Sequence, residues 1–234
     1  MSIITPRGAG HDSSASVLIF VRHGETDANV VGRIDYDTAG ESLNARGRQQ
    51  AQAVATYLAR DLRARQILVH TVYTSDQNRA LETAQVIADA LGVRITVHPG
   101  LRELRVGTTP EMSLDEVLRA WQQYAEGARR DPDFHLPGGE SPRQLTARIA
   151  HTLQEIIATL AGRHAIIVSH QGTLSTGIAF LLNALDRWRD YQMANCGVTR
   201  IRLTTPPTLE VLNETAYLAE IGTAVWQPTS PSGS

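Results

Sequence analysis

Apolar and polar positions along the chain fall into two kinds of pattern. Residues 17–21 (VLIFV) form an unbroken apolar run, which is typical of a strand buried on both faces of a sheet. Several longer segments instead carry apolar residues three or four positions apart, which is helical spacing. Strands are therefore expected over 17–21, 67–73, 93–97, 165–168, 198–203 and 208–212. Helices are expected over 44–64, 80–91, 113–124, 141–160 and 173–185.

The order of these elements predicts the fold class. Strands that alternate with helices of this length indicate an α/β fold, in which a mostly parallel central sheet carries helices on both faces. Ligands of such sheets bind at the carboxyl-terminal ends of the strands. We expect a single domain over 16–226, with residues 104–140 forming a cap or insertion over the site. The Gly-, Pro- and Ser-rich ends, 1–15 and 227–234, predict disorder.

Chemically useful polar residues follow four of the predicted strands. The segments are RHGET at 22–26, TSDQNRA at 74–80, LREL at 101–104 and SHQG at 169–172. Taken singly, a histidine at a strand end is most often structural, and an arginine is most often a surface charge. Here one rim of the sheet would receive five such side chains: Arg22, His23, Arg79, Glu103 and His170. Convergence of this kind predicts a functional site.

The chain contains no lysine, so all 22 of its Lys+Arg positions are arginine. This absence excludes a Walker-type phosphate loop and a Schiff-base enzyme, because both need a lysine amine. A codon or lineage bias explains the composition most simply. It also means that any anion site must be built from arginine, whose planar guanidinium group binds phosphate oxygens bidentately.

The remaining composition is that of a globular protein. Hydrophobic residues make up 42% of the chain, and the net charge of −2 implies no face for binding nucleic acid. The single cysteine, Cys196, excludes an internal disulfide and a multi-cysteine metal site, and we expect it in the core. No apolar run is long enough for a membrane helix, and no secretory signal is visible. We therefore expect no membrane association and a cytoplasmic location.

The strand-end motifs, in their order along the chain, resemble those of the histidine phosphatase superfamily, the phosphoglycerate mutase-like enzymes. RHGET at 22–26, followed by Asn29, is the most specific of these motifs. The others are LNARGRQQA at 43–51, similar to the family's LTxxGxxQA; SDQNRALETA at 75–84, similar to SxxxRAxxTA; PGGES at 137–141; and VSH at 168–170. The resemblance spans about residues 16–212 and identifies 16–226 as a histidine phosphatase-like catalytic domain.

The resemblance implies a covalent mechanism in which His23 accepts the phosphoryl group and Glu103 acts as general acid. The carbonyl of Gly24 would hold the second ring nitrogen of His23. Side chains from several loops would bind the phosphoryl group or substrate: Arg22, Asn29, Arg79, His170 and Gln171. Since these residues supply the positive charge, we expect no metal and no other cofactor. A plainer alternative makes Glu103 a surface ion-pair partner of Arg102 or Arg105.

The family contains phosphatases and mutases, and the residues after Glu103 favour a phosphatase. The run ELRVG at 103–107 lacks the ERHYG-like sequence of cofactor-dependent phosphoglycerate mutases. It also departs from the Trp-Glu-Gly that usually follows in the phosphatase branch, and Gln171 stands where the family often has glycine. We therefore expect a metal-independent phosphomonoesterase acting on a small phosphorylated metabolite. Mutase-type transfer and a non-catalytic, phospho-ligand-binding role remain as alternatives.

Substrate choice is expected to depend on the cap segment 104–140. Its aromatic residues Trp121, Tyr124 and Phe134 either pack the cap onto the domain or face the pocket, and the sequence does not decide between the two. The expected partner is a small-molecule phosphoester, and a homodimer is left open.

Overall fold

The computed structural model describes residues 15–31, 40–107, 109 and 112–223. The strands are β1 (Val17–Arg22), β2 (Val69–Thr74), β3 (Arg94–Val97), β4 (His164–Ser169), β5 (Val198–Arg202) and β6 (Thr208–Glu214). The α-helices are α1 (Asp27–Val30), α2 (Ala45–Ala64), α3 (Asn78–Leu91), α4 (Leu114–Arg130), α5 (Pro142–Leu160) and α6 (Gln171–Leu181). Three short 3₁₀ segments are η1 (Pro99–Leu101), η2 (Leu185–Asp190) and η3 (Ala216–Leu218).

The strands form one sheet in the order β3-β2-β4-β1-β5-β6. β3, β2, β4 and β1 are mutually parallel, whereas β5 runs antiparallel to both β1 and β6. In the register of the central strands, Arg22 lies opposite Ser169 and Thr74 lies opposite Val168. The loops that follow β1, β2 and β4 therefore leave the sheet at the same edge.

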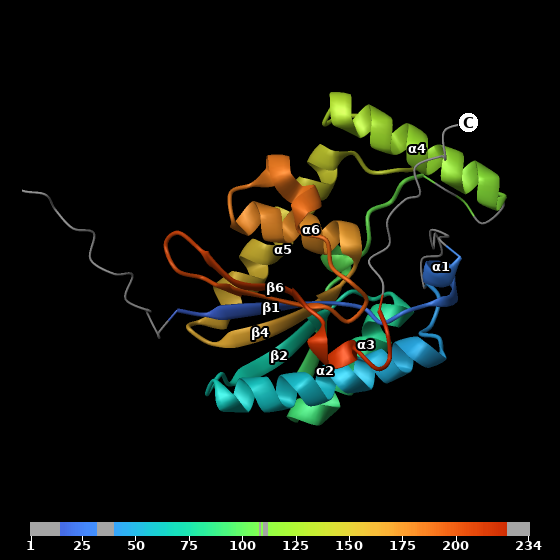
Figure 1. Ribbon diagram of the computed structural model, residues 1–234. Helices are drawn as coiled ribbons and strands as arrows, with labels where there is room; N and C mark the ends of the chain where they lie inside the picture. Colours follow the sequence, from blue (N-terminus) through green and yellow to red (C-terminus); the bar gives the residue numbers. More distant parts are fainter. Residues whose placement is uncertain (1–14, 32–39, 108, 110–111, 224–234) are drawn as a thin grey trace, which may run out of the picture.

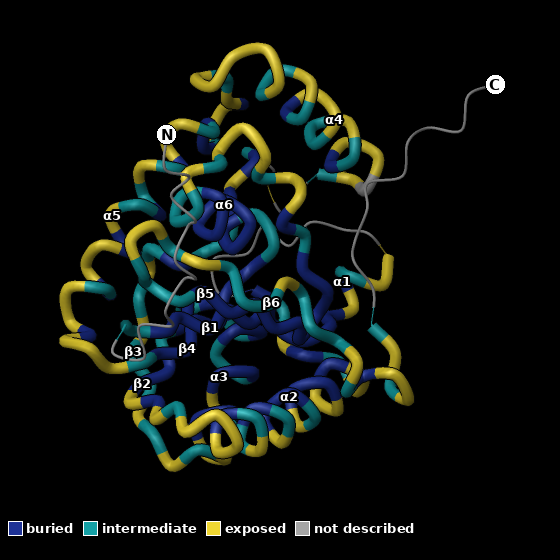
Figure 2. The backbone as a smooth tube through the Cα atoms, turned by 60° about the vertical axis from the view of Figure 1, so that its left-hand side comes forward, coloured by how far each residue is buried: buried dark blue, intermediate teal, exposed yellow. Residues whose placement is uncertain are grey.

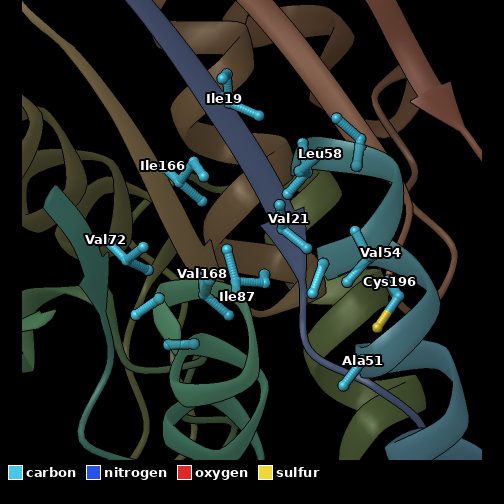
Figure 3. Packing of buried hydrophobic residues seen from close by; sticks show 14 of the residues in the cluster. Ile19, Val21, Ala51, Val54, Leu58, Val72, Ile87, Ile166, Val168 and Cys196 are labelled. Carbon is cyan, nitrogen blue, oxygen red and sulfur yellow. The ribbon is translucent and has the colours of Figure 1, made fainter. Parts of the chain in front are cut away.

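Helices cover both faces of the sheet, which confirms the predicted α/β fold class. α2 and α3 lie on one face, and α5 and α6 lie on the other (Figure 1). Every residue of β1 is buried, because successive side chains enter opposite cores. Figure 3 shows the core beneath α2 and α3, where Val21 of β1 lies beside Val54 and Leu58 of α2. Leu18 and Phe20 enter the second core, against α5 and α6.

Two predicted helices differ most from the observed ones. The helix expected to end near residue 124 continues to Arg130, and Gly127 within it lets the ring of Phe134 approach closely: a Cβ there would lie 2.3 Å from a ring carbon. The helix expected over 173–185 begins earlier, at Gln171, because His170 is its N-terminal cap residue. It also ends earlier, at Leu181.

α4 projects furthest from the sheet and is exposed along much of its outer side (Figures 1 and 2). No helix in the described part of the chain combines the length and apolarity that crossing a membrane requires. Apart from Ala15, the ends predicted to be disordered, 1–15 and 227–234, lie outside the described residues. The single domain over 16–226 stays a prediction.

Candidate active site

The loop after β1 is shaped by a close contact between two glycines. A Cβ on Gly24 would lie 2.6 Å from the carbonyl oxygen of Gly47, and a Cβ on Gly47 would lie 2.1 Å from the carbonyl oxygen of Glu25. Real Cβ atoms do not approach other atoms so closely, so glycine is required at both positions. Through this contact, the turn at residues 22–25 packs closely against the first turn of α2. It explains why two motifs separated in sequence each need a glycine.

The ring of His23 is held by hydrogen bonds at both nitrogens. Nδ1 lies 2.7 Å from the carbonyl oxygen of Gly24, and Nε2 accepts a hydrogen bond of 3.3 Å from Nε of Arg79. A carbonyl can only accept, so Nδ1 carries the proton and Nε2 keeps its lone pair. The side chain is 3% exposed. His23 is thus oriented as a neutral imidazole, with the contact to Gly24 that the sequence predicts.

His170 lies beside His23 and is fully buried, with 5.1 Å between the two ring centroids. Its Nε2 lies 2.8 Å from the hydroxyl of Ser75, whose oxygen already accepts a hydrogen bond from the backbone N–H of Gln77. Nε2 of His170 is the only acceptor that the described residues offer to the Ser75 hydroxyl proton, so the hydroxyl donates to Nε2 and the His170 proton lies on Nδ1. Nδ1 is sealed from solvent and has no partner among the described residues. The site thus contains an unused N–H donor next to His23.

Arg22 supplies a second unused donor. Its Nη1 donates to the carbonyl of Met193 at 2.9 Å, which anchors one end of the guanidinium group. Its Nε is buried and has no partner in the part of the chain that the structure describes. Burial lowers the pKa of Arg22 to about 10, and the negative charge of Glu103 partly offsets this lowering. Arg22 therefore stays charged at neutral pH, and Glu103 lies within electrostatic reach of it.

Both histidines are poor bases in this environment. Burial lowers the pKa of His23 well below its ordinary value of 6.5, and Arg79 and Arg22 lower it further. Burial also dominates for His170, where Arg79, His23 and Arg22 again lower the pKa. Protonating either ring would place another positive charge among buried cations. Each imidazole is therefore neutral at pH 7.

This environment predicts a pH-dependent stability. In the unfolded chain the histidines take up protons near pH 6.5, whereas in the folded chain they do so only at lower pH. The free energy of unfolding should therefore fall as pH drops below 6.5, by up to about 1.4 kcal/mol per pH unit for each buried histidine. Urea unfolding between pH 7 and 5 would measure the slope, which His23→Asn should reduce. His151→Asn, at an exposed position, should leave it unchanged; equal slopes in all three proteins would contradict the prediction.

The carboxylate of Glu103 points at the N-terminus of α6 rather than at a neighbouring arginine. Oε1 accepts backbone hydrogen bonds from Leu104 (2.8 Å) and Thr173 (3.1 Å), and Oε2 accepts one from Gly172 (3.1 Å). A Cβ on Gly172 would lie 2.9 Å from Oε1, so this approach needs glycine. Arg102 pairs instead with Asp76. The alternative that makes Glu103 a surface ion-pair partner is wrong, since Glu103 forms no ion pair with any described residue.

The segment that carries Glu103 is held from several elements. Arg148 of α5 donates from Nη1 to the carbonyls of Gly100 (2.7 Å) and Arg102 (3.0 Å), and its Nε and Nη2 bind the two carboxylate oxygens of Glu140. The hydroxyl of Thr173 also donates to the carbonyl of Arg102, at 2.6 Å. Glu140 belongs to the PGGES motif. Its role here is to hold Arg148 in place, which the motif alone did not reveal.

Asn29 and Gln171, the remaining predicted substrate ligands, differ in how their amides are used. Oδ1 of Asn29 accepts hydrogen bonds from Thr26 N (3.2 Å) and from Nδ2 of Asn195 (3.0 Å), whereas its own Nδ2 has no partner among the described residues. Both amide atoms of Gln171 are engaged inside the protein, with the hydroxyl of Ser175 and the backbone N–H of Met193. Gln171 thus connects α6 to the segment before β5, where the carbonyl of Met193 accepts the hydrogen bond from Arg22.

Asn195 is a site residue that sequence reasoning missed. Its Nδ2 donates to the carbonyl of His23 at 3.0 Å as well as to Asn29, and the side chain is buried. It therefore links the backbone of His23 to the amide of Asn29. Nothing in the local sequence around residue 195 distinguishes this asparagine from a turn residue.

The cap aromatics contribute to the second core. Tyr124 is buried within it, and Trp121 and Phe134 are partly buried against it. Trp121 and Tyr124 stack with 5.9 Å between their ring centroids. These contacts favour the packing interpretation of the three residues. The described residues include no group of three or more His, Cys, Asp or Glu side chains that could hold a metal ion.

Comparisons with known proteins agree with this arrangement. The chain matches the histidine phosphatase superfamily (branch 1) over residues 18–215. The probable phosphoglycerate mutase GpmB of Salmonella choleraesuis (strain SC-B67) is 33% identical over 191 residues, which cover 79% of this chain and 83% of GpmB.

Solved structures with similar folds include two phosphatases. Phosphoserine phosphatase from Entamoeba histolytica, in complex with 3-phosphoglyceric acid, has a TM-score of 0.72 and 27% identity, over 87% of this chain and 99% of its own. Mycobacterial glucosyl-3-phosphoglycerate phosphatase, in complex with VO3, has a TM-score of 0.70 and 26% identity, over 86% and 100%. The match over residues 18–215, the identity with GpmB and the shared fold lead to one assignment: the chain belongs to branch 1 of the histidine phosphatase superfamily.

Proposed function

We propose that the protein is a metal-independent phosphomonoesterase that hydrolyses a small phosphorylated metabolite through a phosphohistidine at His23. One observation carries this proposal: two buried donors without partners among the described residues, Nδ1 of His170 and Nε of Arg22, belong to the same site as a neutral His23 whose Nε2 keeps its lone pair. Donors of this kind suit phosphoryl oxygens that gain negative charge during transfer.

In the first step, Nε2 of His23 attacks phosphorus and the ester P–O bond breaks. The Nδ1 proton stays on the ring and is shared with the Gly24 carbonyl, which stabilises positive charge on the phosphorylated imidazole. Arg22, Arg79 and His170 bind the phosphoryl oxygens. Glu103 enters this step in its protonated form and gives its proton to the departing alkoxide; Oε2 is the better oxygen to carry that proton, because it accepts fewer hydrogen bonds than Oε1.

In the second step, water attacks phosphorus and the P–N bond breaks. Glu103 takes the proton from that water, so that inorganic phosphate leaves and both residues return to their starting states. Positioned cations and N–H donors supply the electrostatic stabilisation that a divalent metal supplies in other phosphoryl-transfer enzymes.

Mutase-type transfer is the second candidate, because the curated relative with 33% identity is named a probable phosphoglycerate mutase. A mutase needs the same nucleophile, cations and acid, and differs by returning the phosphoryl group to a second substrate oxygen. Two structural neighbours are named as phosphatases, and the run after Glu103 lacks the mutase-like sequence, which favours hydrolysis.

A substrate screen tests the proposal. Phosphorylated metabolites and p-nitrophenyl phosphate would be ranked by kcat/KM at mildly acid pH, with and without excess chelator, and 3-phosphoglycerate with its bisphosphate primer would serve as the mutase control. We expect phosphate release that excess chelator leaves unchanged. Mutase turnover faster than hydrolysis would favour the second candidate, and binding without turnover would favour a non-catalytic role.

A further inference from the structure

Gln77 is a buried side chain that the proposed mechanism does not use. It is the N-terminal cap residue of α3, yet its side chain makes no capping hydrogen bond. Short side chains that accept an N–H from the first helical turn are preferred at such positions. Gln77 is only 6% exposed, and its side chain contacts Arg79 and the backbone of Glu103 instead. A leucine would fill a similar volume without the cost of burying an amide, so the amide itself needs an explanation.

The contacts of Gln77 reach three parts of the site. Its Oε1 accepts a hydrogen bond from the backbone N–H of Glu103 at 3.1 Å and another from Nη2 of Arg79 at 3.4 Å. Its own backbone N–H donates to the hydroxyl of Ser75 at 3.1 Å, and that hydroxyl also binds His170. The amide oxygen of Gln77 therefore connects Arg79, which would bind the phosphoryl group, with the backbone of Glu103, the proposed acid.

The two contacts of Oε1 also fix the orientation of the amide. Two N–H donors converge on one atom, so that atom must be the oxygen rather than the nitrogen. Arg79 in turn donates to the Nε2 of His23 that would attack phosphorus. A continuous chain of hydrogen bonds thus runs from the nucleophile through Arg79 and Gln77 to the backbone of Glu103.

We propose that Gln77 is a positioning residue, whose amide oxygen sets the placement of Glu103 relative to the phosphoryl group held by Arg79. This inference rests on the proposed function. Its consequence is specific, because a displaced acid slows only reactions that need a proton at the leaving group. An alkoxide needs that proton, whereas p-nitrophenolate leaves without it. Loss of the amide should therefore damage alkyl phosphates more than aryl phosphates.

The test compares kcat/KM of Gln77→Leu with two substrates, p-nitrophenyl phosphate and the best alkyl phosphate from the screen. We expect a loss of about 100-fold with the alkyl ester and about 10-fold or less with the aryl ester, the size that a displacement of about 1 Å produces. Glu103→Gln should show the same preference for the aryl ester. In a variant that combines Gln77→Leu with Glu103→Gln, the alkyl-to-aryl ratio should be close to that of Glu103→Gln alone. The reason is that both substitutions impair the same proton transfer.

Two further variants separate positioning from folding. Gln85→Leu makes the same substitution at an exposed position of α3, where Gln85 binds Asp89, and should leave the ratio and the activity unchanged. Gln77→Glu keeps an acceptor oxygen and should return the alkyl-to-aryl ratio toward the wild-type value, even if its charge weakens binding of both esters. If Gln77→Leu does not fold, Gln77→Met keeps the length of the side chain and gives the same readout.

Equal losses with both esters, or no loss with either, would overturn the positioning role. A wild-type protein that hydrolyses no phosphoester would refute the proposed function, and this inference with it. The two failures are distinguishable, because the first appears only in the variants and the second appears in the unmodified protein.

Discussion

Replacing His23 with alanine should lower kcat/KM by at least about 10⁴-fold, the scale seen when a covalent nucleophile is removed. The reason is local. No other described side chain combines a lone pair at Nε2 with a neighbouring Arg79 and His170, so the phosphoryl group has no alternative acceptor within the site. Phosphate release from p-nitrophenyl phosphate would measure the loss.

The control for this variant is His151→Ala, which removes an exposed imidazole that contacts Glu155 one helical turn away. It should retain full activity. A second measurement traps the intermediate: brief reaction followed by alkaline quenching should leave phosphate on the wild-type protein and on the control, but not on His23→Ala. Substantial turnover by His23→Ala would contradict the covalent mechanism.

Arg22→Lys should lower kcat/KM by about 10²- to 10³-fold, although it conserves the charge. Two nitrogen atoms of the Arg22 guanidinium group have different roles. Nη1 donates to the carbonyl of Met193, whereas Nε has no partner among the described residues and would donate to the phosphoryl group. A lysine ammonium is a single point and cannot hold both places at once. The loss corresponds to one misplaced donor to a developing anion.

Steady-state kinetics and vanadate inhibition would both report this change, because vanadate and a phosphoryl group in transfer place oxygens similarly. The matched control is Arg63→Lys, in the exposed last turn of α2, which we expect to be indistinguishable from wild type. An Arg22→Lys variant with wild-type kcat/KM and unchanged vanadate inhibition would show that charge alone is sufficient there.

The parts of the site that could be predicted from the sequence are those formed by residues adjacent to one another along the chain. RHGET is a strand end followed by a tight turn, so His23 and Arg22 could be located from a buried apolar run and the motif after it. The α/β class followed in the same way, from periodicity alone. The helix expected over 113–124 continues to Arg130 as α4, and Gly127 within it makes room for Phe134.

The supporting contacts could not be predicted, because they join ordinary residues across long separations. Asn195 bonds to the backbone of His23 172 positions away, and Ser75 meets His170 across 95. Serine, asparagine and glutamine occur throughout the chain, and only the folded arrangement distinguishes the few that matter. The orientation of Glu103 depends likewise on the start of α6, which was placed two residues too late.

The position of β1 between β4 and β5 has a consequence for the newly synthesised protein. His23 directly follows β1, whereas the segments that pair with β1, 164–169 and 198–202, come much later in the sequence. A nascent chain that has been synthesised only as far as α5 therefore contains His23 without either of the strands that flank β1. The contacts that orient His23, including the hydrogen bond from Asn195, can therefore form only after the chain up to β5 has been synthesised.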